Sequence, residues 1–199
     1  MIHNQICWSV VATLPPARCP TAATSLTGRT VSLVHLISIH TDSTFASVDH
    51  AAFSAAIKEK ANSTDPFFFA VFYGHGRPGS GLRCPMCINL EQLLLEIGHG
   101  WFCPSIQRTT VAAEAMFPFP SYAFDTLGYR RVEWRAKSLN DRSRRAALRF
   151  GFLFEAIFRQ HDILKGRSWD TSWHSLLRDG KDGKQVRRPF DLWLQETFR

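Results

Sequence analysis

Short stretches in the first half of the chain are apolar throughout or alternate apolar with polar residues, as β-strands do. The alternating stretch 28–36 predicts a half-buried strand, and the strongly apolar stretch 66–73 predicts a second strand. A Gly- and Pro-rich stretch, 74–81, predicts a hairpin loop. Residues 82–90 and 93–102 are then predicted as the antiparallel strands that follow it.

Helical spacing of apolar residues first occurs at 51–61, where Asp49 is a predicted N-cap. Beyond Gln107 the predicted order is helix, strand, helix, strand, strand, helix. The predicted boundaries are Gly128 after the first of these helices, Asn140 or Asp141 before the second and Gly151 behind it. In this half we predict a first helix at about 109–127, strands at 129–136, 152–158 and 171–177, and a closing amphipathic helix at 186–198.

This order of elements predicts a mixed α/β domain built on one sheet. At 199 residues and 22.6 kDa the chain has the size of a single domain. Residues 1–25, rich in Pro, Ala, Thr and Ser, lack sustained periodicity and are predicted to be a loose N-terminal extension. Residues 26–199 are predicted to form the domain itself.

Pro118 and Pro120 lie inside the helix predicted at 109–127. A proline in a helix interior removes a backbone hydrogen bond and costs about 3 kcal/mol. We therefore expect the helix to kink or break there.

Composition excludes several classes of protein. With 45% hydrophobic residues the chain is globular, and no apolar stretch approaches the roughly 20 residues that span a bilayer. The apolar run from Cys7 to Leu14 has no basic segment ahead of it, so we expect no secretory signal and a cytoplasmic location without a membrane partner. Five cysteines without regular spacing agree with a reducing compartment. Cys84 and Cys87 have CxxC spacing, but no second ligand pair accompanies them, so we predict no metal site.

The formal charge of +7 and a pI near 9.5 indicate a polyanionic partner. Three readings are open: a solvated basic surface, a cofactor that carries phosphate groups, or a nucleic acid. Four arginines cluster on one predicted helix, but no nucleic-acid-binding module accompanies them, so we do not expect nucleic acid to be the partner. These arginines are Arg142, Arg144, Arg145 and Arg149.

Five blocks follow one another from Glu96 to Leu177. They are EIGHGWFCP (96–104), SIQRTTVAAEAMF (105–117), YRRVEWRA (129–136), SLNDRSRRAALRFGFLFEAIFRQ (138–160) and KGRSWDTSWHSLL (165–177). Together, and in this order, they resemble the GNAT superfamily of N-acetyltransferases, in particular the branch that includes the enzymes acetylating ribosomal-protein N-termini and many small-amine acetyltransferases. The resemblance implies a mixed, mostly antiparallel sheet of six or seven strands flanked by helices. It also implies that the fourth and fifth strands splay apart and that the cofactor, acetyl-CoA, inserts between them.

The resemblance also implies where acetyl-CoA binds. Residues 107–112 stand where the family has a Q/R-x-x-G-x-G/A loop at a helix N-terminus, a place suited to phosphate groups. Thr110 replaces the usual glycine. The implied cofactor-binding residues are Phe102, Cys103, Gln107, Arg108, Thr109, Thr110, Val111 and Ala112, followed by Asn140 and Ser143 in the family pattern N-x-x-S-x-x-x-A-x-x-x-G-F.

Two residues are candidates for the chemistry. By the resemblance, Ser143 would lie near the sulfur and protonate or stabilise the departing thiolate, although serine is also common in a first helical turn. Glu96, on the strand that lines the cleft, is the candidate general base. His99 is the other candidate, and strand alternation places these two side chains on opposite faces of the sheet. A structural role is the alternative for each.

The sequence therefore predicts an acyltransferase that uses acetyl-CoA to acetylate a primary amine, on a small molecule or a protein N-terminus, by direct attack on the thioester. One alternative is a degenerate domain that no longer catalyses. The segment at 37–48 is shorter than in the family, where it helps to wall the acceptor site, and the helix prolines favour the same alternative. The acceptor and the oligomeric state are left open.

Overall fold

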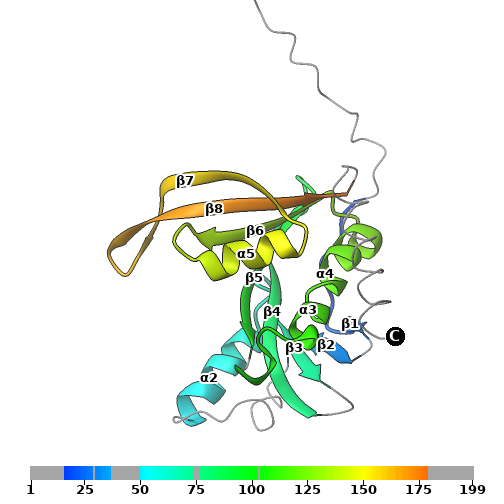
Figure 1. Ribbon diagram of the computed structural model, residues 1–199. Coiled ribbons are helices and arrows are strands. Elements are labelled where there is room, and N and C mark those ends of the chain that lie inside the picture. Colours follow the sequence, from blue (N-terminus) through cyan, green and yellow to red (C-terminus); the bar gives the residue numbers. More distant parts are fainter. Residues whose placement is uncertain (1–15, 29, 37–49, 74–76, 103, 179–199) are drawn as a thin grey trace, which may run out of the picture.

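The computed structural model describes residues 16–28, 30–36, 50–73, 77–102 and 104–178. Within these residues, eight strands form one sheet in the order β1-β2-β3-β4-β5-β6-β8-β7 (Figure 1). All neighbours are antiparallel except β5 and β6, which are parallel. The strands are β1 (Ser25–Thr27), β2 (Val31–His35), β3 (Phe69–Tyr73), β4 (Arg77–Asn89), β5 (Leu94–Phe102), β6 (Arg131–Lys137), β7 (Leu153–Leu164) and β8 (Arg167–Leu177).

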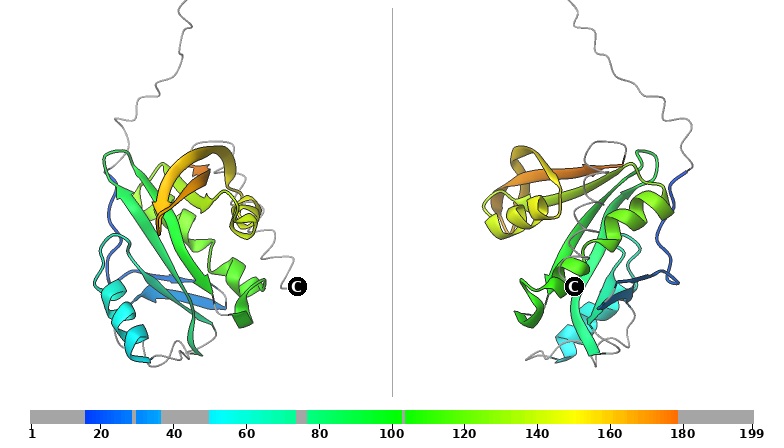
Figure 2. Two further views of the ribbon diagram at one scale, coloured as in Figure 1. Left: turned by 90° about the vertical axis from the view of Figure 1, so that its left-hand side faces the viewer. Right: turned by 45° about the vertical axis from the view of Figure 1, so that its right-hand side comes forward.

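Helices cover both faces of this sheet (Figure 2). α2 packs on one face through a small core, whereas α3, η3 and α5 share the main core on the other face. The predicted mixed α/β fold, with a mostly antiparallel sheet flanked by helices, is therefore confirmed. The helical elements are α2 (His50–Ala61), η2 (Pro104–Ile106), α3 (Thr110–Glu114), α4 (Pro118–Ser121), η3 (Tyr122–Leu127) and α5 (Asp141–Arg149).

The apolar run around β3 is continuous because both of its faces are buried. Phe67, Phe69 and Val71 belong to the main core, and Phe68 and Ala70 belong to the core beneath α2. This alternation follows the period of two along an extended chain. A strand covered on both sides needs no polar positions, which explains why this stretch does not alternate in sequence.

The centre of the sheet opens between β5 and β6. Their ladder consists of three residue pairs, Leu94↔Arg131, Leu95↔Val132 and Glu96↔Glu133, although β5 continues to Phe102 and β6 to Lys137. The predicted splay of these strands, the fourth and fifth of the expected order, is confirmed. It begins directly after Glu96 and Glu133.

The connection from β5 to β6 contains the break that its prolines predict. α3 ends at Glu114, and Pro118 is the first residue of α4, where a missing N–H removes no intrahelical bond. The segment then finishes as a π-helical turn, η3, closed by Gly128 with a φ of 86°. Farther on, Asn140 caps α5 and Gly151, with a φ of 85°, follows it, as predicted.

Several predicted boundaries are wrong. The sheet has eight strands rather than six or seven, because Ser25–Thr27 adds an edge strand. The predicted hairpin loop at 74–81 is too long, since β4 already begins at Arg77. The strands predicted at 152–158 and 171–177 are parts of a longer hairpin, β7–β8.

The described part of the predicted N-terminal extension is hydrogen-bonded rather than loose. The backbone N–H of Arg18 donates to the Leu127 carbonyl at 2.9 Å, and the hydroxyls of Thr24 and Tyr122 lie 2.9 Å apart. These contacts attach the chain before β1 to η3. The division into an extension and a domain of residues 26–199 stays a prediction. The predicted cap Asp49, the segment 37–48 and the helix at 186–198 lie outside the described residues.

Candidate functional site

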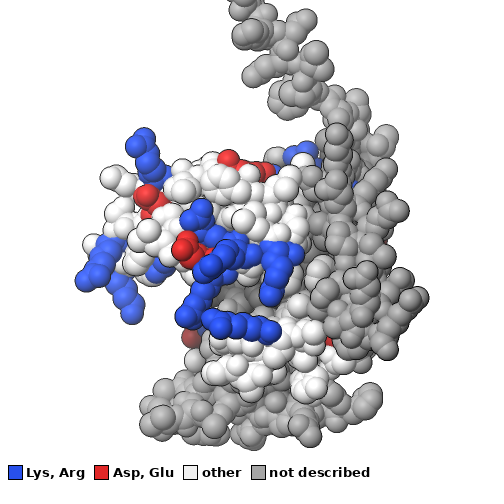
Figure 3. Space-filling view, in the orientation of Figure 1, with Lys and Arg blue, Asp and Glu red and all other residues white. Residues whose placement is uncertain are grey.

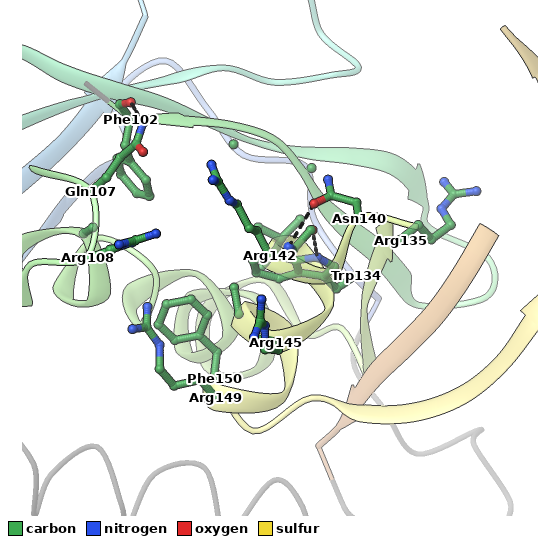
Figure 4. Close-up of a pocket in the computed structure, with 16 residues that line it drawn as sticks. Phe102, Gln107, Arg108, Trp134, Arg135, Asn140, Arg142, Arg145, Arg149 and Phe150 are labelled. Atoms are coloured by element: carbon green, nitrogen blue, oxygen red, sulfur yellow. Dashed lines mark hydrogen bonds between the residues drawn. The ribbon is translucent and has the colours of Figure 1, made fainter. Parts of the chain in front are cut away.

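A cavity of about 640 Å³ opens where β5 and β6 diverge (Figure 4). Its walls come from the end of β5, the turn before α3, the middle of β6 and the exposed side of α5. Both apolar and cationic side chains contribute to it. The lining residues are Ile97, Gly98, Gly100, Phe102, Gln107, Arg108, Ala112, Trp134, Arg135, Asn140, Arg142, Ser143, Arg145, Ala146, Arg149 and Phe150.

The wall between β5 and α3 is held by side-chain hydrogen bonds. Gln107 Nε2 donates to the Phe102 carbonyl at 2.9 Å, which ties the turn to the end of β5. The Thr109 hydroxyl donates to the Ile106 carbonyl at 2.6 Å and accepts from the Ala112 N–H at 3.4 Å. Thr109 is thus the N-cap of α3 and does not line the cavity, whereas Gln107 and Ala112 do.

The opposite wall is the first turn of α5. Asn140 Oδ1 accepts a hydrogen bond from the Ser143 N–H at 3.1 Å, which caps the helix. Since the oxygen is used by the cap, the amide nitrogen of Asn140 is the group available to a ligand. The Ser143 hydroxyl oxygen accepts a hydrogen bond from Trp134 Nε1 at 2.9 Å. Both candidate side chains therefore lie at the cavity, each with a fixed local partner.

The cavity is strongly positive. Arg142, Arg145 and Arg149 follow one another at helical spacing on α5, and Arg108 faces them from the turn before α3. Figure 3 shows Lys and Arg side chains gathered on the face over α5. With Arg135, five arginines line the cavity, and its described lining residues include no carboxylate.

Glu96 does not line this cavity. Its register partner on β4 is Met86, which packs against the core beneath α2, so Glu96 points to the α2 side of the sheet. The buried Glu96 carboxylate forms an ion pair with Arg135. Arg135 points away from the α5 arginines, and its Nη2 lies 2.6 Å from Cys87 Sγ (Figure 4).

The structure brings most of the predicted site residues together. Those at the cavity are Phe102, Gln107, Arg108, Ala112, Asn140 and Ser143. Three others are not among its lining residues: Thr109, the exposed Thr110, and Val111, whose side chain belongs to the main core. Cys103 and the side chain of His99 lie outside the described residues.

Sequence reasoning missed two features of the site. The arginine cluster on α5 is not among the predicted site residues, although three of its members line the cavity. Residues 142, 145 and 149 share one helix face directly after the Asn140 cap, and this spacing could have placed the cluster beside the predicted site residues. The second feature is the hydrogen bond from Trp134 to Ser143, which no pattern in the sequence indicates.

Across the described side chains, no group of three or more His, Cys, Asp or Glu residues could hold a metal ion. Among the helices that the structure describes, none is long and apolar enough to cross a membrane.

Comparisons with known proteins agree with this geometry. The family model described as an acetyltransferase (GNAT) domain matches residues 39–153, more than half of the chain. The protein belongs to the GNAT acetyltransferase family. A GCN5-related N-acetyltransferase from Brucella melitensis is 35% identical, with a TM-score of 0.86 over 92% of this chain and 90% of that chain. The protein is therefore an acyltransferase, as predicted.

Two more distant structures share the fold. One, from Vibrio cholerae, is assigned as a ribosomal-protein-serine acetyltransferase; it is 16% identical, with a TM-score of 0.69 over 79% of this chain and 99% of that chain. The other is the microcin C7 self-immunity acetyltransferase MccE in complex with acetyl-CoA and AMP. It is 16% identical, with a TM-score of 0.64 over 75% of this chain and 93% of that chain. Among curated proteins, none matches the chain.

Proposed function

We propose that this GNAT protein transfers the acetyl group of acetyl-CoA to a primary amine, on a small molecule or a protein N-terminus. The observation that carries the proposal is the arginine-lined cavity at the divergence of β5 and β6. Coenzyme A has three phosphate groups, and guanidinium groups bind phosphate oxygens in pairs. The MccE structure, which contains acetyl-CoA, adds support for this cofactor in the fold.

The cavity is suited to both ends of such a cofactor. Arg108, Arg145 and Arg149 offer charge for the phosphates, whereas Ile97 and Ala146 offer apolar surface for the pantetheine arm. The Asn140 amide would donate to an amide carbonyl of that arm. This arrangement accounts for the basic cluster without a nucleic acid.

The reaction we propose is a direct displacement. The neutral amine nitrogen attacks the thioester carbonyl carbon, the C–S bond breaks, and the sulfur leaves with its electron pair as a thiolate. Ser143 would donate a hydrogen bond to that thiolate. The interaction strengthens as charge develops, so it lowers the barrier more than it improves binding. The proton that the amine loses is taken up first by a general base and, once the base releases it, neutralises the thiolate.

Glu96 is our candidate acceptor for the amine proton, reached from the α2 side of the sheet. Its ion pair with Arg135 sets a limit on this role, because protonation of the carboxylate would remove the attraction between them. The free thiols of Cys19 and Cys87 support our further proposal that the reaction takes place in a reducing, cytoplasmic compartment.

Isothermal titration with acetyl-CoA, followed by a thiol-release assay over a panel of amines, tests the function. We expect binding, and release of coenzyme A with at least one amine. Arg145→Ala combined with Arg149→Ala should weaken acetyl-CoA binding about tenfold or more, since charged hydrogen bonds are lost. Lys58→Ala on α2, an exposed cation on the other face, is the matched control. If the double arginine variant and Lys58→Ala bind acetyl-CoA with equal affinity, the cavity is not the cofactor site.

A further inference from the structure

Trp134 connects β6 to the first turn of α5 at the floor of the cavity. Its Nε1 lies 2.9 Å from Ser143 Oγ, and the dashed line in Figure 4 marks this bond. An indole N–H can only donate, so Ser143 Oγ is the acceptor. No other described residue hydrogen-bonds this oxygen. One side of the hydroxyl is thus occupied, and its own proton remains available to a different partner.

We propose that Trp134 is a positioning residue that directs the Ser143 hydroxyl proton toward the departing sulfur of acetyl-CoA. The inference rests on the proposed function and adds to it a residue that acts only through Ser143. A serine hydroxyl rotates about its C–O bond and can point its proton in several directions. When the indole N–H occupies one lone-pair direction, orientations that point the proton at the indole are excluded. The remaining orientations point the proton away from the indole.

Trp134 is well fixed for this task. Its side chain is 6% exposed, and its ring packs against Phe150 and Phe152 with centroids 6.1 and 5.5 Å apart. Trp134 is the first residue of β6 beyond the last β5–β6 pair, so its backbone has no partner in the β5–β6 ladder. On its other side, the backbone of Trp134 is paired with His174 on β8. A donor held by a strand and an acceptor held by a capped helix need little rearrangement during the reaction.

Ser143 is fixed independently of Trp134. Its N–H donates to Asn140 Oδ1 at 3.1 Å, so the backbone position of Ser143 is set by the cap of α5. Removal of the indole N–H therefore leaves the serine in place and frees only the rotation of its hydroxyl. This separation makes the role of Trp134 measurable.

The hydrogen bond also changes the strength of the hydroxyl as a donor. A hydroxyl that accepts a hydrogen bond becomes a better donor, because the chain of bonds polarises. The serine keeps its proton throughout the proposed step. The sulfur takes the electrons of the broken C–S bond, and the thiolate is neutralised by the proton that the amine loses.

The competing interpretation is that Ser143 merely satisfies a buried indole N–H. The two interpretations differ in a double-mutant cycle of Trp134→Phe and Ser143→Ala. If Trp134 acts through Ser143, Trp134→Phe lowers kcat about three- to tenfold and leaves acetyl-CoA affinity within twofold. The double variant then has the kcat of Ser143→Ala alone. In the packing interpretation the two losses multiply.

Two further variants serve as a packing control and as a replacement for Trp134→Phe. Phe152→Leu disturbs the same ring cluster without touching the hydrogen bond, and its effect on kcat should multiply with that of Ser143→Ala. Benzothienylalanine at position 134 keeps the two-ring shape and lacks the N–H, so it replaces Trp134→Phe if that variant does not fold. A normal kcat in this variant, or losses that multiply with Ser143→Ala, would overturn the role of Trp134.

The wild-type protein separates this inference from the function on which it rests. If it releases no thiol with any amine, the proposed function fails and the role of Trp134 fails with it. If it is active and the donor-free variants are as active, the role of Trp134 fails alone.

Discussion

Thr109 and Asn140 are both helix N-caps near the cavity, but they differ in which of their polar atoms are hydrogen-bonded to the helix. The Thr109 hydroxyl is engaged both as donor, to Ile106, and as acceptor, from Ala112. Asn140 uses its oxygen for Ser143 and retains an amide group at the cavity. A cap and a ligand contact are therefore compatible in Asn140, whereas the hydroxyl of Thr109 serves the helix alone.

Substitutions of Asn140 separate its two roles. Asn140→Ser retains a capping oxygen and loses the amide, so we expect stability to change by only a few tenths of a kcal/mol and acetyl-CoA affinity to fall about fivefold. Asn140→Ala also loses the cap and should lower the free energy of unfolding by about 1 kcal/mol. Urea unfolding and titration calorimetry measure the two effects. Wild-type affinity in Asn140→Ser would leave this residue as a cap only.

Glu96 and Arg135 are expected to depend on each other. Glu96→Gln leaves the guanidinium beside a neutral group, and we expect a loss of about 2 kcal/mol in the free energy of unfolding. This is below the range for fully buried pairs, because 23% of the Arg135 side chain is exposed. Glu96→Gln combined with Arg135→Gln should recover much of the loss.

The same Glu96 variant tests the proposed base. If Glu96 accepts the amine proton, Glu96→Gln should lower activity most at low pH, with partial recovery as pH rises toward the pKa of the amine. An unchanged pH–rate profile, measured with the most active amine of the panel, would return Glu96 to a structural role.

At the scale of elements, the connection from β5 to β6 explains why a broken helix is tolerated. Parallel strands need a crossover that returns the chain to the same end of the sheet. α3, α4 and η3 together make this return, and no single long helix is required. Pro118 and Pro120 predicted from sequence that the helix breaks. They did not predict that Pro118 would be the first residue of a new helix.

Most elements were predictable because the pattern of their apolar residues follows which faces of the strand or helix are buried. β6 alternates apolar with polar residues, β3 is apolar throughout because both of its faces are buried, and α2 has apolar residues at helical spacing. Caps at Asn140 and Gly128 set the limits of helices. The β7–β8 hairpin was predicted too short because its outer part is exposed and irregular. Its register shifts between Phe158 and Asp162, and no apolar period marks such a stretch. The contact from Trp134 to Ser143 depends on how β6 and α5 pack, which no local pattern encodes.

At the scale of the whole molecule, stability should depend on pH through His174. This side chain is 1% exposed, between β8 and α5, and burial lowers its pKa below its ordinary value of 6.5. The backbone of Trp134 opposes this shift, and the Arg144 guanidinium adds to it. As pH falls below 6.5 the unfolded chain therefore binds a proton before the native protein does, and stability falls.

The effect can be measured by urea unfolding at several pH values. Between pH 6.5 and 5 we expect stability to fall by up to about 1.4 kcal/mol per pH unit for this group. His174→Gln should reduce the slope, and the remainder includes His35, whose pKa burial also lowers. The hydrogen bonds from Arg131 lower the pKa of Glu155. The stability that the ionised Glu155 carboxylate contributes is therefore lost only below pH 4.5, outside the range from pH 6.5 to 5. An equally steep slope in His174→Gln would assign the proton uptake to another residue.

Three residue pairs, from Leu94↔Arg131 to Glu96↔Glu133, join two blocks of strands into one sheet. Among the described residues, the hydrogen-bond ladders run through β1–β5 and through β6–β8, and they cross from one block to the other only at this narrow seam. A small change of angle at the seam produces a larger displacement at the far ends of β5 and β6, because these ends lie farther from the seam. A cofactor lodged in the gap would brace both arms, so acetyl-CoA should slow amide hydrogen exchange on β5 and β6 together.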